Sequence, residues 1–265
     1  MIPIKRGKQI SAMRQACGTA NAILQELCRM IQPGITTGEI DLRAKQLFAD
    51  AGVRSAFFRY HGFPGQICIS VNEEVVHGIG GRRIIHPGDI LKLDVGVIQN
   101  GWVGDTATTH PVGSVSTETW DLLNATEEAL FIGISQARPG NRLGDLCSAI
   151  EQSVLARGYT VVREFVGHGV GRKLHEEPQI PNFGKKHTGP HFRPGMTLAI
   201  EPMVNFGRPE VKILADHWTV ITADRQPSAH FEHTILVTEG EPEILTWRER
   251  ATSTKPGSPA QAVLS

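Results

Sequence analysis

A repeat within the sequence limits the possible fold more than any other feature. Residues 87–94 (PGDILKLD) match residues 194–201 (PGMTLAIE), because each segment has Pro-Gly followed by an alternating apolar strand that ends in a carboxylate. Two further matches keep nearly the same offset: they pair Pro33-Gly34 with Pro139-Gly140, and His61-Gly62 with His168-Gly169. Three matches in the same order predict two related halves, with Asp94 and Glu201 as symmetry mates.

Each half is predicted to contain a helix pair and a set of strands. Apolar residues recur at helical spacing from residue 8 to residue 31, and Thr36 with Glu39 forms a capping box that opens a second helix ending near Gly52. The same spacing predicts helices at 117–137 and 142–157. Strands are predicted at 67–76, 89–98, 160–166, 196–204, 218–222 and 230–237. We therefore expect an α/β (α+β) chain of two pseudo-symmetric halves, with an antiparallel β-sheet and flanking helices.

The composition excludes several classes of protein. The 27 basic and 27 acidic side chains cancel, so no excess charge favours binding to nucleic acid or to a membrane surface. No apolar run approaches the ~20 residues that span a bilayer, and the first residues lack the apolar segment of a signal peptide. Four cysteines without Cys-x-x-Cys spacing indicate a reduced, cytoplasmic chain. Residues 1–250 are expected to form one domain, and the tail 251–265 to be disordered.

A predicted hairpin brings two carboxylates together. Asn100-Gly101 is a strong signal for a two-residue turn, and such a turn places Gly96 opposite Asp105. Asp105 then lies on the same face as Asp94 and diagonal to it, about 7 Å away between backbones. Two buried carboxylates so close repel each other, and one or two cations between them would remove the repulsion.

Three further side chains complete a set of candidate metal ligands. Glu201 (LAIEPM) and Glu232 (HFEHTILV) are carboxylates among strand-forming residues, and His168 lies between glycines in VGHGVGR. Two Asp, two Glu and one His form an oxygen-rich set that favours Mn, Fe or Co and also admits Zn. A pair of such ions would lower the pKa of a shared water and make it a nucleophile near neutral pH.

Each of these residues alone also has an ordinary structural interpretation. A single Asp or Glu in a strand is most often a half-exposed edge residue, and Gly-His-Gly is as typical of a turn as of a ligand. His77 and His175 on their own are more typical of core or surface histidines than of catalytic ones. The repeat favours the joint site, because chance gives no reason for carboxylates at matched strand ends.

The order of short motifs along the chain resembles that of type I methionine aminopeptidases. The resemblance runs from about Ile10 to Leu245 and implies the pita-bread (creatinase/aminopeptidase) fold, whose internal pseudo-symmetry agrees with the repeat. The motifs that carry it are Asn72-Glu73, His77-Gly78-Ile79, Leu93-Asp94-Val95, Gly104-Asp105-Thr106, Gly167-His168-Gly169-Val170-Gly171, His175-Glu176-Glu177-Pro178, Ile200-Glu201-Pro202-Met203 and Glu232-His233-Thr234.

The resemblance also implies a role for each residue of the site. The implied ligands of two divalent ions (Co, Mn, Fe or Zn) are Asp94, Asp105, His168, Glu201 and Glu232. His77 would contact the scissile amide or the amine and assist proton transfer, His175 would donate to the carbonyl oxygen, and Glu201 would relay a proton. The implied pocket for the methionine side chain draws on Tyr60, Phe63, Cys68 and Trp218.

The implied reaction is removal of the N-terminal methionine from peptides and nascent chains, with a small second residue preferred. The resemblance further implies a cytoplasmic monomer that meets nascent chains at the ribosome, binds no nucleic acid directly and contacts no membrane. It assigns the catalytic domain to residues 1–250.

The sequence departs from the family pattern at four positions that are not implied ligands. The family commonly has a small residue such as Cys at Phe57 and Gly at Arg59, and it often has His at Val103 and an aromatic at Leu174.

Two other functions remain open. Prolidase and aminopeptidase P share the five-ligand set but usually carry a large extra N-terminal domain, and non-catalytic relatives that bind a partner have typically lost metal ligands.

Overall fold

A curled antiparallel sheet of nine strands forms the centre of the chain in the computed structural model, which describes residues 1–247. Its strand order is β1-β4-β5-β14-β9-β7-β8, with β2 beside β4 and β15 beside β14. These strands are β1 (Arg54–Ser55), β2 (Cys68–Val71), β4 (Ile90–Gln99), β5 (Trp102–Pro111), β7 (Gly167–Gly169), β8 (Glu176–Ile180), β9 (Thr197–Ile200), β14 (Glu232–Leu236) and β15 (Glu243–Ile244).

Two smaller sheets of three strands each flank the large one. One has the order β13-β10-β6 and the other β11-β12-β3. Their strands are β3 (Glu74–Val76), β6 (Thr160–Val161), β10 (Met203–Asn205), β11 (Val211–Ile213), β12 (Val220–Thr222) and β13 (Ser228–His230).

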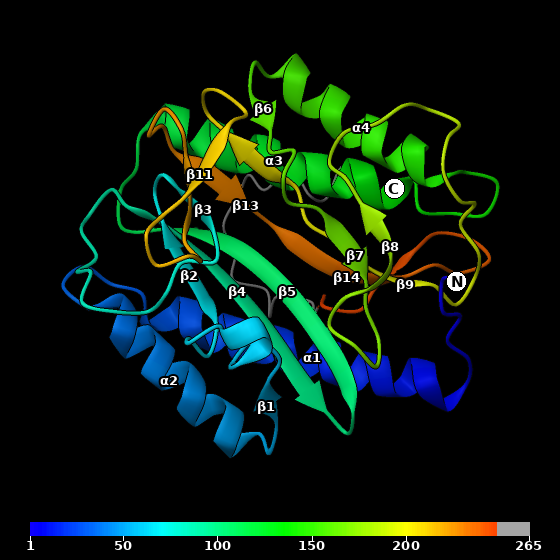
Figure 1. Ribbon diagram of the computed structural model, residues 1–265, viewed down its shortest axis with the longest axis horizontal. Coiled ribbons are helices and arrows are strands. Elements are labelled where there is room, and N and C mark those ends of the chain that lie inside the picture. Colours follow the sequence, from blue (N-terminus) through cyan, green and yellow to red (C-terminus); the bar gives the residue numbers. More distant parts are fainter. Residues whose placement is uncertain (248–265) are drawn as a thin grey trace, which may run out of the picture.

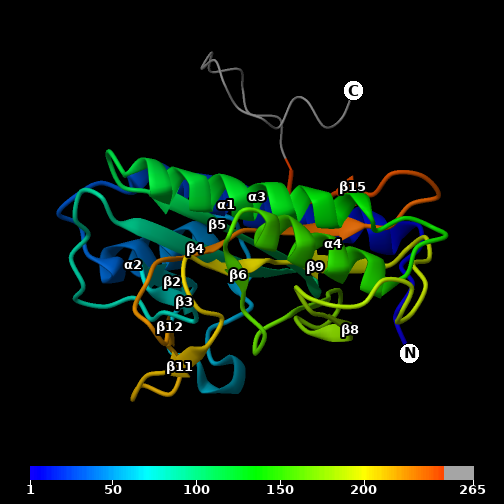
Figure 2. The ribbon, with the colours of Figure 1, turned by 90° about the horizontal axis from the view of Figure 1, so that it is seen from above.

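The helices lie where the hydrophobic spacing predicts them. They are α1 (Lys8–Met30), α2 (Thr37–Asp50), α3 (Thr117–Ser135) and α4 (Leu143–Ala156), and a short 3-10 turn, η1, spans Tyr60–Gly62. The predicted capping box begins α2: the Glu39 N–H donates to Thr36 Oγ1 (3.2 Å), and the Thr36 N–H donates to the Glu39 carboxylate (2.7 Å). Figures 1 and 2 show α1 and α3 along one side of the sheet, with β3, β8, β11 and β12 on the opposite side.

The repeat in the sequence corresponds to a repeat in the structure. Strands β5 and β14 pair at the middle of the large sheet, so each half contributes one edge and one helix pair. An isolated bridge joins Thr36 to Ile84 at the start of α2, and its counterpart joins Arg142 to His191 at the start of α4. The pita-bread fold and its two halves are therefore confirmed.

One of the three sequence matches has no structural counterpart. His168 lies in β7, whereas His61 lies in η1 outside the sheets, with a left-handed φ of 48°. The other matches hold in detail: Gly88 and Gly195 both have φ of 92°, in the turns that precede β4 and β9. An L-residue rarely adopts this conformation, which explains a glycine at both places.

Several strands differ from the prediction. The segment 67–76 divides into β2 and β3 at Asn72, whose φ is 51°, and the segment 196–204 divides into β9 and β10. The segment 160–166 contains only β6, and β1, β7, β8, β11, β15 and all of β13 but its last residue were not predicted. These missed strands are short, and β7 and β8 contain Gly or charged residues that carry little strand signal.

Helices and sheet bury one apolar cluster in each half. In the first half, α1 and α2 cover Leu91, Leu93, Val95 and Val97, which alternate along β4 on one face of the sheet. In the second half, α3 and α4 cover the corresponding face of β9 and β14. Alternation puts the remaining residues of β4, including Asp94, on the opposite face, away from the helices.

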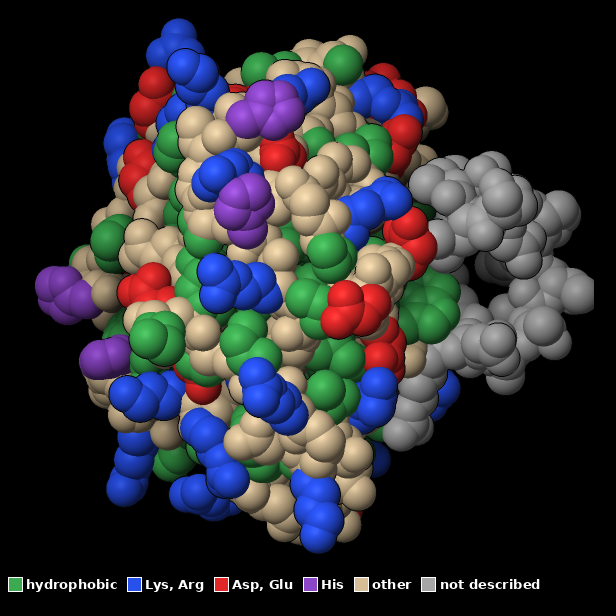
Figure 3. Space-filling model, turned by 90° about the vertical axis from the view of Figure 1, so that its right-hand side faces the viewer, with side chains coloured by type: hydrophobic (Ala, Val, Ile, Leu, Met, Phe, Trp, Pro, Cys, Tyr) green, Lys and Arg blue, Asp and Glu red, His purple; other side chains and the backbone are tan. Residues whose placement is uncertain are grey.

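The surface in Figure 3 mixes charges of both signs. Lys and Arg side chains lie among Asp and Glu side chains, and apolar side chains are scattered. Within residues 1–247, no helix is both long and apolar enough to cross a membrane. The tail predicted at 251–265 lies outside the described residues.

Candidate metal centre and substrate pocket

The structure brings all eleven predicted site residues to one cavity of about 820 Å³. It opens on the side of the sheet that the helices leave uncovered. The residues are Tyr60, Phe63, Cys68, His77, Asp94, Asp105, His168, His175, Glu201, Trp218 and Glu232. These residues are spread over positions 60 to 232 of the chain, so it is the fold that brings them to one cavity.

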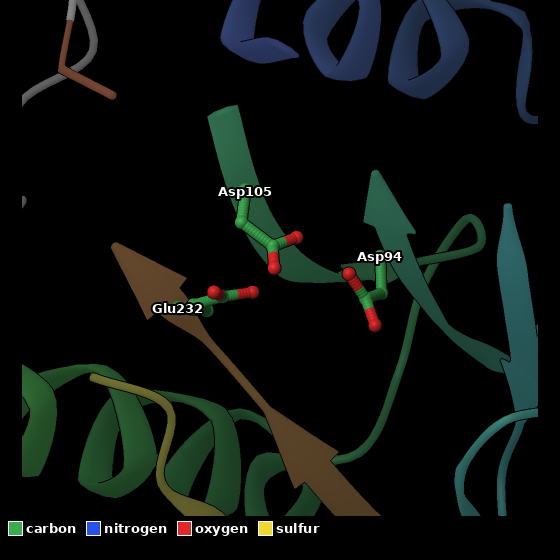
Figure 4. Close-up of side chains that lie close together, drawn as sticks. All are labelled: Asp94, Asp105 and Glu232. Atoms are coloured by element: carbon green, nitrogen blue, oxygen red, sulfur yellow. The ribbon is translucent and has the colours of Figure 1, made fainter. Parts of the chain in front are cut away.

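Three carboxylates meet at the floor of the cavity. The hairpin register is as predicted, since Gln99 pairs with Trp102 across the turn and Gly96 pairs with Asp105. Asp94 from β4, Asp105 from β5 and Glu232 from β14 each direct a carboxylate oxygen into a space where the three oxygens lie within 4.8 Å of one another. Figure 4 shows the three side chains pointing toward a common centre.

The electrostatics of this cluster are unfavourable without a cation. Asp94 Oδ1, Asp105 Oδ1 and Glu232 Oε1 are buried and have no hydrogen-bond partner. Burial, followed by repulsion from neighbouring carboxylates, raises the pKa of Asp94, Asp105, Glu201 and Glu232 well above the usual range. Buried charges of one sign and unpaired oxygens are what a bound metal ion would neutralise.

His168 presents a neutral nitrogen to the same space. Its Nε2 lies 3.5 Å from Glu201 Oε1 and 3.8 Å from Asp105 Oδ2. Its Nδ1 lies 3.0 Å from the Gly169 carbonyl oxygen, which only accepts, so Nδ1 carries the proton. Burial lowers the pKa of His168 to about 3, and the free lone pair on Nε2 therefore points at the carboxylates.

Glycines on both sides of His168 allow this close approach. A Cβ at Gly167 would collide with the Ala199 carbonyl, and a Cβ at Gly169 would collide with the backbone of Glu177. β7 is therefore pressed between β9 and β8, and this holds the imidazole over the carboxylates.

Together these residues form a donor set that fits hard divalent ions. Four carboxylates and one neutral imidazole supply oxygen and nitrogen donors, and the set contains no thiolate. The Cys68 thiol lines the cavity, but burial and the Asp94 charge raise its pKa well above the usual value, so it stays protonated.

Two histidines lie between the carboxylates and the mouth of the cavity. His77 follows β3 with φ of 59°, and burial followed by the charge of His175 lowers its pKa to about 4. The His175 ring lies 4.4 Å from the ring of His168, and its Nδ1 lies 3.0 Å from Tyr60 Oη. Burial also lowers the pKa of His175. Both rings are therefore mainly neutral and able to exchange protons with a bound molecule.

The remaining walls of the cavity are apolar and aromatic. Phe63 and Trp218 meet edge to face with ring centroids 5.2 Å apart, and His77 meets Phe165 at 5.3 Å. Of the four departures from the family pattern, Phe57 and Leu174 line the cavity, whereas Arg59 and Val103 do not belong to its described lining. Arg59 has a left-handed φ of 66°, a conformation that suits the Gly commonly found there.

The sequence reasoning missed His230. Its Nε2 is buried without a hydrogen-bond partner and lies 3.5 Å from Glu201 Oε2, on the far side of that carboxylate from His168. Burial lowers its pKa to about 3, so it faces Glu201 as a neutral ring. The signal was the alternation His230-Phe231-Glu232, which places His230 and Glu232 on one face.

Comparison with known proteins identifies similar chains. Residues 11–239 match the model of metallopeptidase family M24. Methionine aminopeptidase 1 of Bacillus subtilis is 48% identical over 93% of this chain and 99% of its own length, and methionine aminopeptidase of Escherichia coli is 41% identical over 94% and 95%.

Solved structures agree with these sequence matches. The crystal structure of methionine aminopeptidase from Thermotoga maritima superimposes with a TM-score of 0.92 at 43% identity, covering 94% of this chain and 100% of that one. Prolidase from Pyrococcus furiosus reaches a TM-score of 0.77 at 24% identity over 93% and 66%, which shows a shared fold alone.

Proposed function

Since this chain belongs to metallopeptidase family M24, we propose that it hydrolyses the peptide bond after an N-terminal methionine and prefers a small second residue. One observation carries the proposal: the candidate metal ligands and an apolar, aromatic pocket line the same cavity. The identity to several methionine aminopeptidases over nearly the whole chain supports it.

We propose that Asp94, Asp105, His168, Glu201 and Glu232 hold two divalent ions. Three unpartnered carboxylate oxygens and the free Nε2 of His168 support this assignment. When bound, such ions supply Lewis acidity, which makes water a nucleophile near neutral pH.

The protein's own groups would move protons around the scissile bond. Glu201 lies between two neutral histidines, with His168 3.5 Å from one oxygen and His230 3.5 Å from the other, so its carboxylate is oriented to accept and pass on a proton. His175 is held through Nδ1 by Tyr60, which leaves Nε2 to contact the carbonyl oxygen of the substrate. His77 would contact the amide nitrogen or the amine.

The methionine side chain would occupy the apolar part of the cavity. Phe63, Trp218, Tyr60 and Cys68 present rings and one sulfur, and thioethers pack favourably against such groups. We also propose that the enzyme acts as a monomer in the cytoplasm on nascent chains at the ribosome. Cys17, Cys68 and Cys147 are free thiols, which agrees with a reducing compartment.

The test is release of methionine from Met-Ala-Ser by EDTA-stripped protein and by protein reloaded with Mn, Fe or Co. We expect release only after reloading, and no cleavage of an Xaa-Pro dipeptide. Cleavage of the Xaa-Pro dipeptide alone would favour a proline-specific peptidase. Failure to bind metal at all would favour a non-catalytic relative.

Variants separate ligands from groups that act on substrate. Asp105→Ala and His168→Ala should lose bound metal and activity together, measured by metal analysis of the dialysed protein. His77→Ala and His175→Ala should keep the metal and lose mainly turnover. Loss of metal from His175→Ala would contradict the role given to His175.

A further inference from the structure

Lys92 is a buried lysine to which the proposed mechanism gives no task. It lies in β4, two residues before Asp94, and only 1% of its surface is exposed. Lysines are almost never fully buried unless they are paired with an opposite charge. Of the ion pairs within residues 1–247, none includes Lys92.

The partners of Lys92 are backbone carbonyl oxygens. Its Nζ donates to the Asn72 carbonyl oxygen at 2.6 Å and to the Ser228 carbonyl oxygen at 2.9 Å. The nearest carboxylates have other partners, since Glu74 pairs with Arg83, and Asp89 accepts from the Asn72 side chain. Burial lowers the pKa of Lys92 to about 7, while the charges of Glu74 and Glu73 oppose this. Short hydrogen bonds to two carbonyl oxygens also favour the charged form.

The two carbonyls belong to segments that lead into the proposed active site. Asn72 forms the turn between β2 and β3, and β3 is followed directly by His77. Ser228 begins β13, which leads through His230 to Glu232. β13 lies beside β3 and β4, as Figure 1 shows, so Lys92 reaches from β4 to both neighbours.

Further hydrogen bonds join Asn72, Ile90 and Ser228, so that β4, the turn after β2 and the start of β13 meet in one junction. The Asn72 backbone N–H donates to the Ile90 carbonyl, and its side-chain oxygen accepts from the Ile90 N–H. The Ser228 N–H donates to the same Asn72 carbonyl that accepts from Lys92. The ammonium group therefore bonds directly to the backbone of this junction, whereas the Asp89 carboxylate reaches it only through the Asn72 side chain.

We propose that Lys92 is a positioning residue that acts as a tethered cation: its ammonium group fills a site of carbonyl oxygens and so holds the segments that carry His77, Asp94 and Glu232 in register. Ammonium and potassium ions have similar size and both bind carbonyl oxygens. The proposal therefore predicts that removal of the side chain leaves a site that a small monovalent cation can enter.

The first experiment is thermal unfolding of metal-free Lys92→Ala in potassium, ammonium or tetramethylammonium chloride at equal ionic strength. Without a small cation, orphaned carbonyls should lower the melting temperature by roughly 5–10 °C. Potassium or ammonium should restore at least half of this loss in a saturable way, and tetramethylammonium, which is too large, should not. The matched control is Lys92→Met, which fills the space with an apolar chain and should not respond.

The second experiment measures turnover of Met-Ala-Ser by Mn-loaded Lys92→Ala in the same salts. We expect kcat to fall about tenfold or more and to recover with potassium or ammonium, with KM changed less, because the cation restores the placement of His77 and Glu232. This arm rests on the proposed function, whereas the melting arm does not. A wild type that cuts nothing would refute the function alone.

The following results would overturn the inference. The first is a melting temperature of Lys92→Ala that responds equally to all three salts. The second is a Lys92→Met enzyme as active as wild type. If Lys92→Ala does not fold in any salt, Lys92→Gln decides, because it keeps an N–H donor without the charge. It should melt below wild type, and equal stability would show that the charge has no positioning role.

Discussion

Replacement of Asp105 by Asn should change stability in opposite directions with and without metal. Asp105 is buried, with 3% of its surface exposed, and its carboxylate lies within 4.8 Å of those of Asp94 and Glu232. At an effective dielectric constant of about 20, two unit charges at this distance repel by about 3.5 kcal/mol. The metal-free protein avoids part of this repulsion by retaining protons, which costs about 1.4 kcal/mol for each pH unit above the ordinary pKa.

The free-energy cost of charge repulsion and the cost of proton retention are similar in size. Near neutral pH, about three units above the ordinary Asp pKa, proton retention costs about 4 kcal/mol. Asp94 and Glu232 still repel each other in Asp105→Asn, and the amide must find partners. We therefore expect metal-free Asp105→Asn to be more stable than wild type by about 2 kcal/mol, which corresponds to a rise in melting temperature of roughly 4–8 °C.

With metal bound, the wild type should be more stable than Asp105→Asn. Free Mn at a hundred times its dissociation constant stabilises the wild type by about 2.7 kcal/mol per site, whereas Asp105→Asn has lost a ligand and should gain little. The assay is differential scanning fluorimetry of both proteins with EDTA and across an Mn titration. Asp121→Asn, at an exposed position of α3, is the control and should behave as wild type. Destabilisation of the metal-free protein by Asp105→Asn, or equal responses of both proteins to Mn, would refute the reasoning.

Three further predictions concern pH, selectivity and turnover. A raised pKa in the folded state means that stability is lost as pH rises through that pKa, so the metal-free wild type should lose stability relative to Asp105→Asn as pH rises above about 4, the ordinary pKa of Asp. The lowered pKa of Lys92 acts equally in both proteins and cancels in this difference. Phe57→Cys should change the ratio of kcat/KM for Met-Ala-Ser and Met-Val-Ser more than it changes kcat/KM for Met-Ala-Ser, and an unchanged ratio would mean that Phe57 only packs. Tyr60→Phe should lower kcat about tenfold with metal content unchanged, because the hydrogen bond that orients His175 is lost; full activity would contradict this.

Local patterns explain what could be predicted from the sequence. The Asn100-Gly101 turn sets the pairing of β4 with β5, so the relation of Asp94 to Asp105 followed from turn chemistry and alternation. The helices followed from apolar spacing and, for α2, from the capping box at Thr36. The pairing of the two halves followed from the repeat.

Long-range contacts explain what could not be predicted. β7 and β8 have little strand propensity. β7 becomes a strand because β9 offers a hydrogen-bonding edge far along the chain (His168 pairs with Ala199, 31 positions apart), and β8 pairs in turn with β7. His230 was missed because its importance depends on Glu201, which reaches it only in the folded chain. Lys92 gave no signal either, since a lysine in a strand ordinarily faces water.

The same distinction applies to the four departures from the family pattern. The sequence showed that Phe57 and Leu174 differ, but only the fold shows that both line the cavity, whereas Arg59 occupies a strained turn. A Cβ at Gly96 would strike the Phe57 ring, so that ring lies directly over the hairpin that carries Asp105. Phe57 and Leu174 can affect substrate selectivity only because the fold places them in the cavity wall.

The junction between the halves shows why the candidate site depends on the intact chain. Asp94 and Asp105 come from the first half, and His168, Glu201 and Glu232 come from the second. At the central pair of strands, Thr106 Oγ1 donates to the Glu232 carbonyl at 3.0 Å, and Thr234 Oγ1 donates to the Asp105 carbonyl at 2.8 Å.

These reciprocal hydrogen bonds fix the backbones of the two carboxylates that repel each other across the junction. A metal ion between them would join the halves through their side chains at the same place where the threonines join them through their backbones. The repulsion that weakens the metal-free protein and the attraction that would hold an ion thus arise from one arrangement, and a substitution that relieves the first should weaken the second.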